Sequence, residues 1–226
     1  MTKRALTAMA MLVVLLAAAH VHARSDEAVR RNNFGAELLK QGRLDEAIAE
    51  FERAVEVDPA FPAAQFNLAY AYERRDRIDE AIAQYKKAIQ LEPGNVVGLN
   101  NLGVLYDKKG LYDEAIMSYE EALRADPSNA MVQGNLANAK KNKGVIQERQ
   151  VQISNARKEV EARPKDPRAA YNLARVYAAL DMKDPAFEWL SKALQLGFDD
   201  FQFLRDDPAL AGLKSDPRLG KLMEGH

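Results

Sequence analysis

Small, aromatic and apolar positions repeat every 34 residues through the first half of the chain. The units begin at Ala28, Pro62 and Val96, and places within each unit are counted from that first residue. Place 8 is small, places 20 and 27 are alanine, place 24 is aromatic and place 32 is proline. The members are Gly35, Ala69, Gly103; Ala47, Ala81, Ala115; Ala54, Ala88, Ala122; Phe51, Tyr85, Tyr119; and Pro59, Pro93, Pro127. A fixed period of this size predicts a stack of helical units.

Each unit has the features of two helices joined by a turn. The second helix opens with an identical Asp-Glu-Ala-Ile, and acidic residues in a first turn interact favourably with the helix dipole. Gly42 and Gly110 precede it as turn residues, with Asp76 at the same place in the middle unit. Small residues let two helix axes approach to about 8–10 Å. Proline ends the second helix because it lacks an amide hydrogen.

This pattern resembles the tetratricopeptide repeat (TPR) family, although the family's tryptophan at place 4 is missing. The chain has Arg31, Gln65 and Leu99 there. The resemblance implies an all-α fold, a right-handed α-solenoid of helix-turn-helix repeats whose first helices line a concave inner surface. Three full repeats are predicted over 28–129, namely 28–61, 62–95 and 96–129.

A fourth unit, residues 130–166, starts in register and then departs from the pattern. It keeps small residues at Ala137 and Gly144, but Arg149 stands at place 20, where the other units have alanine. We expect a degenerate repeat with one long, polar second helix from 145 to 163. Two interpretations stay open, a repeat that packs more loosely and a bend or projecting helix used for self-association.

The C-terminal part restores the pattern and then ends it. A fifth repeat is predicted over 167–200. Residues 201–226 are too few for another hairpin, but they contain Asp207-Pro208 and Asp216-Pro217. Each pair predicts an aspartate N-cap followed by proline in the first helical turn. Two short capping helices would cover the open end of the fifth repeat, as a solenoid requires.

Residues 1–23 have the pattern of a secretory signal peptide. Lys3 and Arg4 precede the apolar run 5–19, and small residues at Val21 and Ala23 flank His22. We expect cleavage after Ala23 and an exported, periplasmic protein. The alternative is an uncleaved leader that anchors the protein to the inner membrane, although the run is shorter than the roughly 20 apolar residues of a span.

The composition offers little for catalysis. The net charge is −1, and no clustered basic face suggests a nucleic-acid partner. Cysteine is absent, and beyond the leader only His226 remains as a histidine, which excludes Ser–His or Cys–His nucleophiles and His/Cys metal sites. There is no glycine-rich phosphate loop. We therefore expect no enzyme, no cofactor, no metal and no small-molecule substrate.

Asparagine occupies place 6 of every unit. The five are Asn33, Asn67, Asn101, Asn135 and Asn172. In long superhelical members of the family, such as O-linked N-acetylglucosamine transferases, an asparagine ladder holds an extended peptide by its backbone. A carboxamide suits this role because it offers both a donor and an acceptor. The alternative is that asparagine is simply common at this place. On the ladder hypothesis, alanine replacements weaken binding and leave stability unchanged.

Five further candidates for partner binding lie at places 9 and 13 of the first helices. They are Tyr70, Arg74, Lys108, Asn138 and Arg175. The cations would favour an acidic ligand, although a solvated charge pattern explains them equally well. Some family members clamp a C-terminal carboxylate with lysine at place 5 and asparagine at place 9 of the first repeat. Asn32 and Ala36 stand there, so that clamp is absent.

The sequence thus predicts a non-enzymatic scaffold for protein–protein interaction in the cell envelope. It would bind a protein or an extended peptide segment in the concave groove of the superhelix. The alternative is a structural or self-associating subunit of an envelope assembly, which would use the outer faces and the degenerate fourth repeat.

Overall fold

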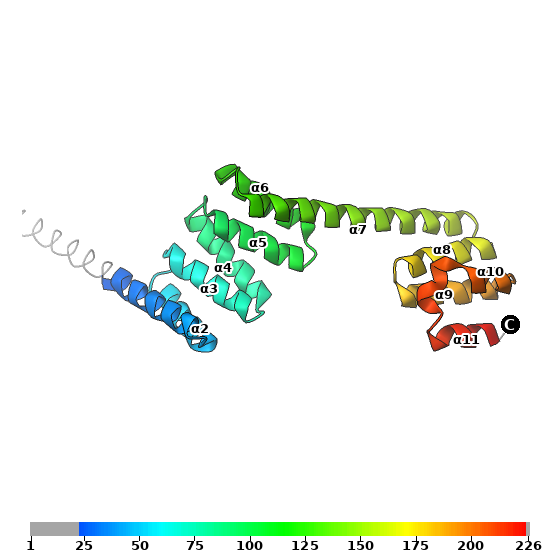
Figure 1. Ribbon diagram of the computed structural model, residues 1–226, viewed down its shortest axis with the longest axis horizontal. Helices are drawn as coiled ribbons and strands as arrows, with labels where there is room; N and C mark the ends of the chain where they lie inside the picture. The colour runs from blue at the N-terminus through cyan, green and yellow to red at the C-terminus, as the bar shows by residue number, and fades with distance from the viewer. Residues whose placement is uncertain (1–22, 225–226) are drawn as a thin grey trace, which may run out of the picture. The chain divides into compact units, whose positions relative to one another are not determined.

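The computed structural model describes residues 23–224, and its regular structure over that range is entirely helical (Figure 1). The predicted leader therefore lies outside the described residues, except for Ala23. The chain forms two compact units, Met1–Lys141 and Asn142–His226, called here the N-terminal and C-terminal units. Within residues 23–224, no helix combines the length and apolar character needed to cross a membrane.

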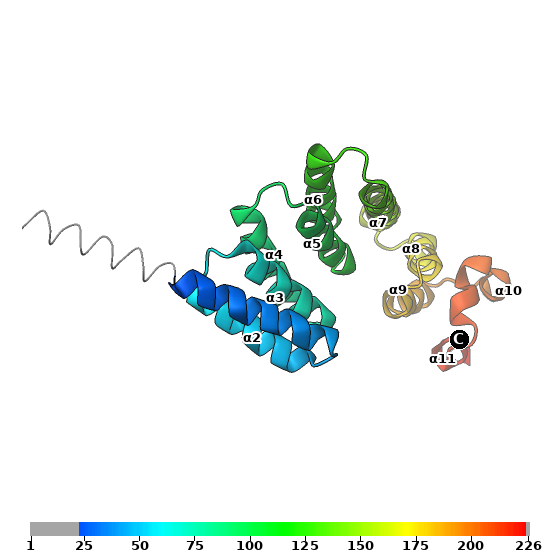
Figure 2. The same cartoon turned by 60° about the vertical axis from the view of Figure 1, so that its left-hand side comes forward.

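The N-terminal unit is built from helical hairpins, as the repeat pattern predicts (Figure 2). The first helix of the described residues covers 23–40. It is followed by α2 (Leu44–Val57), α3 (Pro62–Arg74), α4 (Ile78–Leu91), α5 (Val96–Lys108) and α6 (Tyr112–Ala125). Each of the three predicted repeats thus holds one pair of helices joined by a short turn.

The turn inside each hairpin requires a left-handed backbone. Gly42, Asp76 and Gly110 have φ angles of 78°, 62° and 73°. Glycine adopts this region without a steric cost, and aspartate is among the few other residues that tolerate it. The spacing of these three residues therefore sets where each first helix ends.

The small residue at place 8 is explained by the aromatic ring at place 24 of the same repeat. A Cβ atom on Gly103 would lie 2.5 Å from Cε1 of Tyr119, and one on Gly35 would lie 2.7 Å from Cε1 of Phe51. The ring packs directly on the backbone of the first helix, so even a methyl group would have to displace it. In the first and third repeats this contact brings the two helices of the hairpin close together, while the second repeat has Ala69, the next smallest residue, at this place.

The fourth unit differs from the expectation, because it is one continuous helix, α7 (Ala130–Ala162), and not a hairpin with a long second helix. Gly144 stands at the place of Gly42 and Gly110, yet it remains helical. Folding back would bury Arg149 against the first helix, where the other repeats bury alanine, and an unpaired buried charge is costly. Exposed lysine, glutamine and glutamate favour the continuous helix.

The two ends of α7 belong to different hydrophobic cores. Val132 and Ala139 are buried in the core of the N-terminal unit, and Ile153, Ala156 and Val160 pack in the core of the C-terminal unit. Residues 144–152 between these groups are all exposed. Their apolar side chains are spread around the helix, so this stretch has no continuous apolar stripe that would favour self-association.

The C-terminal unit contains one hairpin and its cap. The hairpin is α8 (Pro167–Ala179) and α9 (Lys183–Gln195), and the cap consists of α10 (Phe201–Asp206), the 3₁₀ helix η1 (Pro208–Leu213) and α11 (Pro217–Glu224). Asp207 and Asp216 accept hydrogen bonds from the amides of Ala209 and Arg218, at 2.8 and 3.0 Å. Both predicted N-caps are thus present, and α10 is an additional helix. The leucines of the cap complete the core under α8 and α9.

Candidate partner-binding surface

Hydrogen bonds between asparagines hold the first helices of successive repeats side by side. Nδ2 of Asn67 donates to Oδ1 of Asn32 at 2.8 Å, and Nδ2 of Asn135 donates to Oδ1 of Asn100 at 2.9 Å. In each pair, place 6 of one repeat contacts place 5 of the repeat before it. The asparagines at place 6 in the N-terminal unit therefore lie on adjacent helices, in one row.

The middle member of the row uses a different acceptor. Place 5 of the second repeat is Phe66, which cannot accept a hydrogen bond, and Asn101 donates instead to the hydroxyl of Tyr85 at 3.0 Å. That hydroxyl donates in turn to the carboxylate of Glu73 at 2.9 Å. Burial and the neighbouring charge of Glu73 raise the pKa of Tyr85. The phenol therefore stays protonated and can donate and accept at once.

These contacts give the ladder a structural role that the sequence analysis missed. Asn67, Asn101 and Asn135 each use a side-chain N–H to join two repeats, while the carboxamide oxygens of Asn67 and Asn135 take no part in these bonds. The acceptors Asn32 and Asn100 stand at the same place two repeats apart. That recurrence was the available signal for the contact.

We therefore expect the triple variant Asn67→Ala, Asn101→Ala, Asn135→Ala to be less stable than the wild type. Each lost hydrogen bond contributes about 1 kcal/mol, partly offset by the better helix propensity of alanine, so the unfolding free energy should fall by about 1–3 kcal/mol in total. Urea unfolding followed by circular dichroism measures this. Asn138→Ala, at an exposed position of α7, is the control. A triple variant as stable as the control would mean that these bonds contribute nothing.

The other candidates of the N-terminal unit are exposed or half-buried on the same first helices. Asn33 and Asn138 are exposed. Arg74 donates to the hydroxyl of Tyr70 at 3.3 Å, and Lys108 forms an ion pair with Asp76 of the preceding repeat at 2.6 Å. Exposed pairs of this kind contribute about 0–1 kcal/mol, so a ligand carboxylate could compete for the cation.

Asn172 and Arg175 lie on α8 in the C-terminal unit, where they line two neighbouring hollows of about 330 and 600 Å³. Arg175 forms an ion pair at 2.5 Å with Asp207, which is fully buried and also accepts a hydrogen bond from the Tyr171 hydroxyl at 2.8 Å. Burial alone would raise the pKa of Asp207, but the Ala209 amide, Tyr171 and Arg175 lower it below its usual value. Arg175 thus ties the cap to α8.

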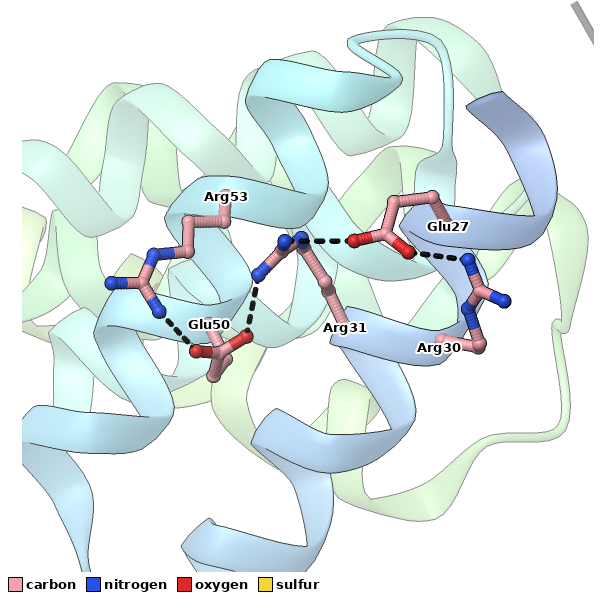
Figure 3. Close-up of polar contacts among 5 residues, drawn as sticks. All are labelled: Glu27, Arg30, Arg31, Glu50 and Arg53. Carbon is pink, nitrogen blue, oxygen red and sulfur yellow. Dashed lines mark hydrogen bonds and ion pairs between the residues drawn. The ribbon is translucent and has the colours of Figure 1, made fainter. Parts of the chain in front are cut away.

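A network of charged side chains stands where the family's tryptophan is missing in the first repeat (Figure 3). Arg31, at place 4, pairs with Glu50 at 3.2 Å and with Glu27 at 2.7 Å. Glu50 also pairs with Arg53, and only 12% of its side chain is exposed. These charged groups pair with one another, so we assign this network to packing and not to partner binding. Among residues 23–224, no cluster of three or more His, Cys, Asp or Glu side chains could hold a metal ion.

Models of the tetratricopeptide repeat match residues 32–96, 96–129 and 167–198, together more than half of the chain. The chain belongs to the tetratricopeptide repeat family. The three matched ranges leave out residues 130–166, most of which form α7. A comparison with curated proteins found no match.

Several solved TPR structures share the fold. The first TPR of Spaghetti (RPAP3), bound to the HSP90 peptide SRMEEVD, is 25% identical with a TM-score of 0.51, over 53% of this chain and 95% of that one. The first TPR domain of human RPAP3 is 23% identical with a TM-score of 0.51, over 55% and 98%. YrrB, described as a TPR protein with an unusual peptide-binding site, is 22% identical with a TM-score of 0.50, over 82% and 94%. The α-solenoid predicted from the sequence is thus confirmed.

Proposed function

We propose that this protein is a non-enzymatic scaffold of the cell envelope that binds an extended segment of a partner protein. The segment would lie on the first helices of the N-terminal repeats. The observation that carries the proposal is the row of Asn67, Asn101 and Asn135, which hydrogen bonds hold at fixed intervals on adjacent helices. The carboxamide oxygens of Asn67 and Asn135 take no part in these bonds, so they suit the N–H groups of a peptide backbone.

The similarity to a TPR solved with a bound peptide supports this function. The mode of binding that we propose does not use a clamp on a C-terminal carboxylate. Asn32 stands at place 5, is only 7% exposed, and already accepts the hydrogen bond from Asn67. Ala36 at place 9 has no polar group to offer. The partner segment would therefore be held along its length through the backbone and need not be a chain terminus.

Site-specific photo-crosslinking tests the surface that is used. A photoreactive residue at Val104, exposed on the first helix α5, should give a discrete crosslinked product in the native host. The matched control is Met117, which is 68% exposed on the second helix α6 of the same repeat and should give none. Crosslinking only from Met117 would instead support the alternative of a structural subunit that uses its outer faces.

Export is the second part of the proposal, and it rests on the sequence of residues 1–23. We expect protein recovered from its native host to begin at Arg24, because the apolar run is short and ends at a small-residue cleavage site. Intact-mass measurement of soluble and membrane fractions tests this. A membrane-bound protein whose mass includes residues 1–23 would show the uncleaved anchor instead.

A further inference from the structure

Exposed apolar side chains recur in the N-terminal unit with the period of the repeats. Val29, Val97 and Met131 stand at place 2 of the first, third and fourth units, and they are 39%, 56% and 60% exposed. Ala63 at place 2 of the second repeat is exposed as well. Single exposed apolar residues are ordinary on a protein surface. A set that follows the 34-residue period forms an ordered row and calls for an explanation.

This apolar row shares a face with the asparagine row. Places 2, 6, 9 and 13 follow helical spacing, so they lie along one side of each first helix. The asparagine bonds hold these helices adjacent. Each set of equal places therefore forms a row that crosses the helices. We call this surface the three-row face. Its rows are apolar (Val29, Ala63, Val97, Met131), carboxamide (Asn33, Asn67, Asn101, Asn135) and cationic (Lys40, Arg74, Lys108).

The cations of the third row remain accessible. Lys40 and Lys108 have side chains that are 76% and 57% exposed. Their partners within the chain are Glu37 at 3.5 Å and Asp76 at 2.6 Å, and both of these carboxylates are exposed too. Because exposed ion pairs are weak, a carboxylate of a bound segment can exchange with them at little cost.

The rows are spaced so that one extended chain can reach all three. A rise of 1.5 Å per residue puts the apolar row about 6 Å from the carboxamide row, and the cationic row about 10 Å away on its other side. A backbone that follows the carboxamide row can place an apolar side chain on one side. On the other side, the long stem of a lysine or arginine lets its charged end reach an acidic side chain of the segment.

The spacing between helices then sets the period of the ligand. First helices are roughly 10 Å apart, and a polyproline II chain rises about 3.1 Å per residue with three residues per turn. Each row therefore meets every third residue, and these residues point to the same side of the chain. Building on the proposed function, we infer that the partner segment has a three-residue period with one acidic and one apolar position. The acidic position faces the cationic row, and the apolar position faces the row of place 2.

Selection from a phage-displayed library of random peptides, about 12 residues long to span four helices, tests the inference on the full chain. In the selected peptides, acidic residues should recur every three positions, and apolar residues should recur every three positions at another place of the same period. Basic peptides, or peptides without this period, would overturn the inference and leave peptide binding intact. If no peptide were enriched, the proposed function would fail together with the inference.

Variants then locate the contact, with a selected peptide synthesised and titrated by calorimetry. Replacing Lys40, Arg74 and Lys108 together by glutamate should weaken peptide binding about tenfold or more. The attraction of three exposed cations for the acidic residues of the peptide becomes a repulsion. The control is Lys86→Glu, Lys87→Glu, Arg124→Glu, the same charge change at exposed positions of the second helices α4 and α6. Circular dichroism checks that both variants fold. If both triple variants lost the same affinity for the peptide, binding would depend on net charge, and the assignment to the three-row face would be wrong.

Discussion

Replacing Ala115 by arginine should lower the unfolding free energy of the N-terminal unit by more than about 3 kcal/mol. Ala115 lies on α6 at place 20 and is 0% exposed, as are Ala47 and Ala81 at the same place of the other repeats. An arginine there would overpack the crossing of two helices and bury a charge without a partner. Urea unfolding followed by circular dichroism measures the loss.

The fourth unit offers the matched control for this substitution. Arg149 stands at the same place of the repeat pattern, but it is exposed on α7, where no second helix covers it. Arg149→Ala should therefore be neutral or slightly stabilising, because alanine is the better helix former. If Ala115→Arg unfolded like the wild type, the alignment of the repeats would be wrong.

Removing the carboxylate of Asp207 should have an effect of similar size on the C-terminal unit. Asp207→Ala leaves the Arg175 guanidinium, the Tyr171 hydroxyl and the Ala209 amide without their buried acceptor. Arg175 is 38% exposed and can reach water, so most of the loss comes from the Tyr171 and Ala209 donors, at about 1–3 kcal/mol for each buried donor left unsatisfied. Trp189, the single tryptophan, lies on α9 and packs against this core, so its fluorescence follows the unfolding of the C-terminal unit. Asp199→Ala, at an exposed position, should leave the urea midpoint unchanged.

The same carboxylate makes this unit sensitive to acid. The pKa of Asp207 is lower in the folded protein than the usual value of about 3.9. The ionised carboxylate therefore contributes fully to the unfolding free energy above that pH, and this contribution is lost as the pH falls towards the folded pKa. The wild type should therefore lose stability below about pH 4 more steeply than Asp207→Ala, as followed by Trp189 fluorescence. Parallel acid curves for the two proteins would contradict this assignment.

The sequence predicts the regular hairpins well because several independent requirements recur at fixed places. A turn residue with positive φ, a small residue under an aromatic ring and a closing proline all agree in the first three repeats. In the fourth unit, Gly144 meets the requirement for a turn residue, but Arg149 replaces the alanine at which the second helix packs. Glycine permits a turn but does not drive one, and the free energy that closes a hairpin comes from burying the second helix. Arg149 opposes that burial. Whether the hairpin closes depends on the gain from burying the second helix against the cost of burying this charge, and a local sequence pattern does not give these two quantities.

The candidate surface was predictable only in part, for a related reason. The row of asparagines follows from periodicity, but what each one bonds depends on a residue a repeat earlier. Asn32 and Asn100 accept where they are present, and Phe66 diverts the bond to Tyr85. The helix α10 was missed because its six residues are too few to show a helical period.

The exposed stretch 144–152 of α7 bears on how freely this sequence can vary in length. A residue added inside one of the hairpins would shift every following place and separate a ring from the glycine beneath it. Between 144 and 152 no side chain is buried, so insertions or deletions there would leave the packing of both hydrophobic cores unchanged. We therefore expect homologues of different length to gain or lose residues at this stretch, although it lies within one continuous helix.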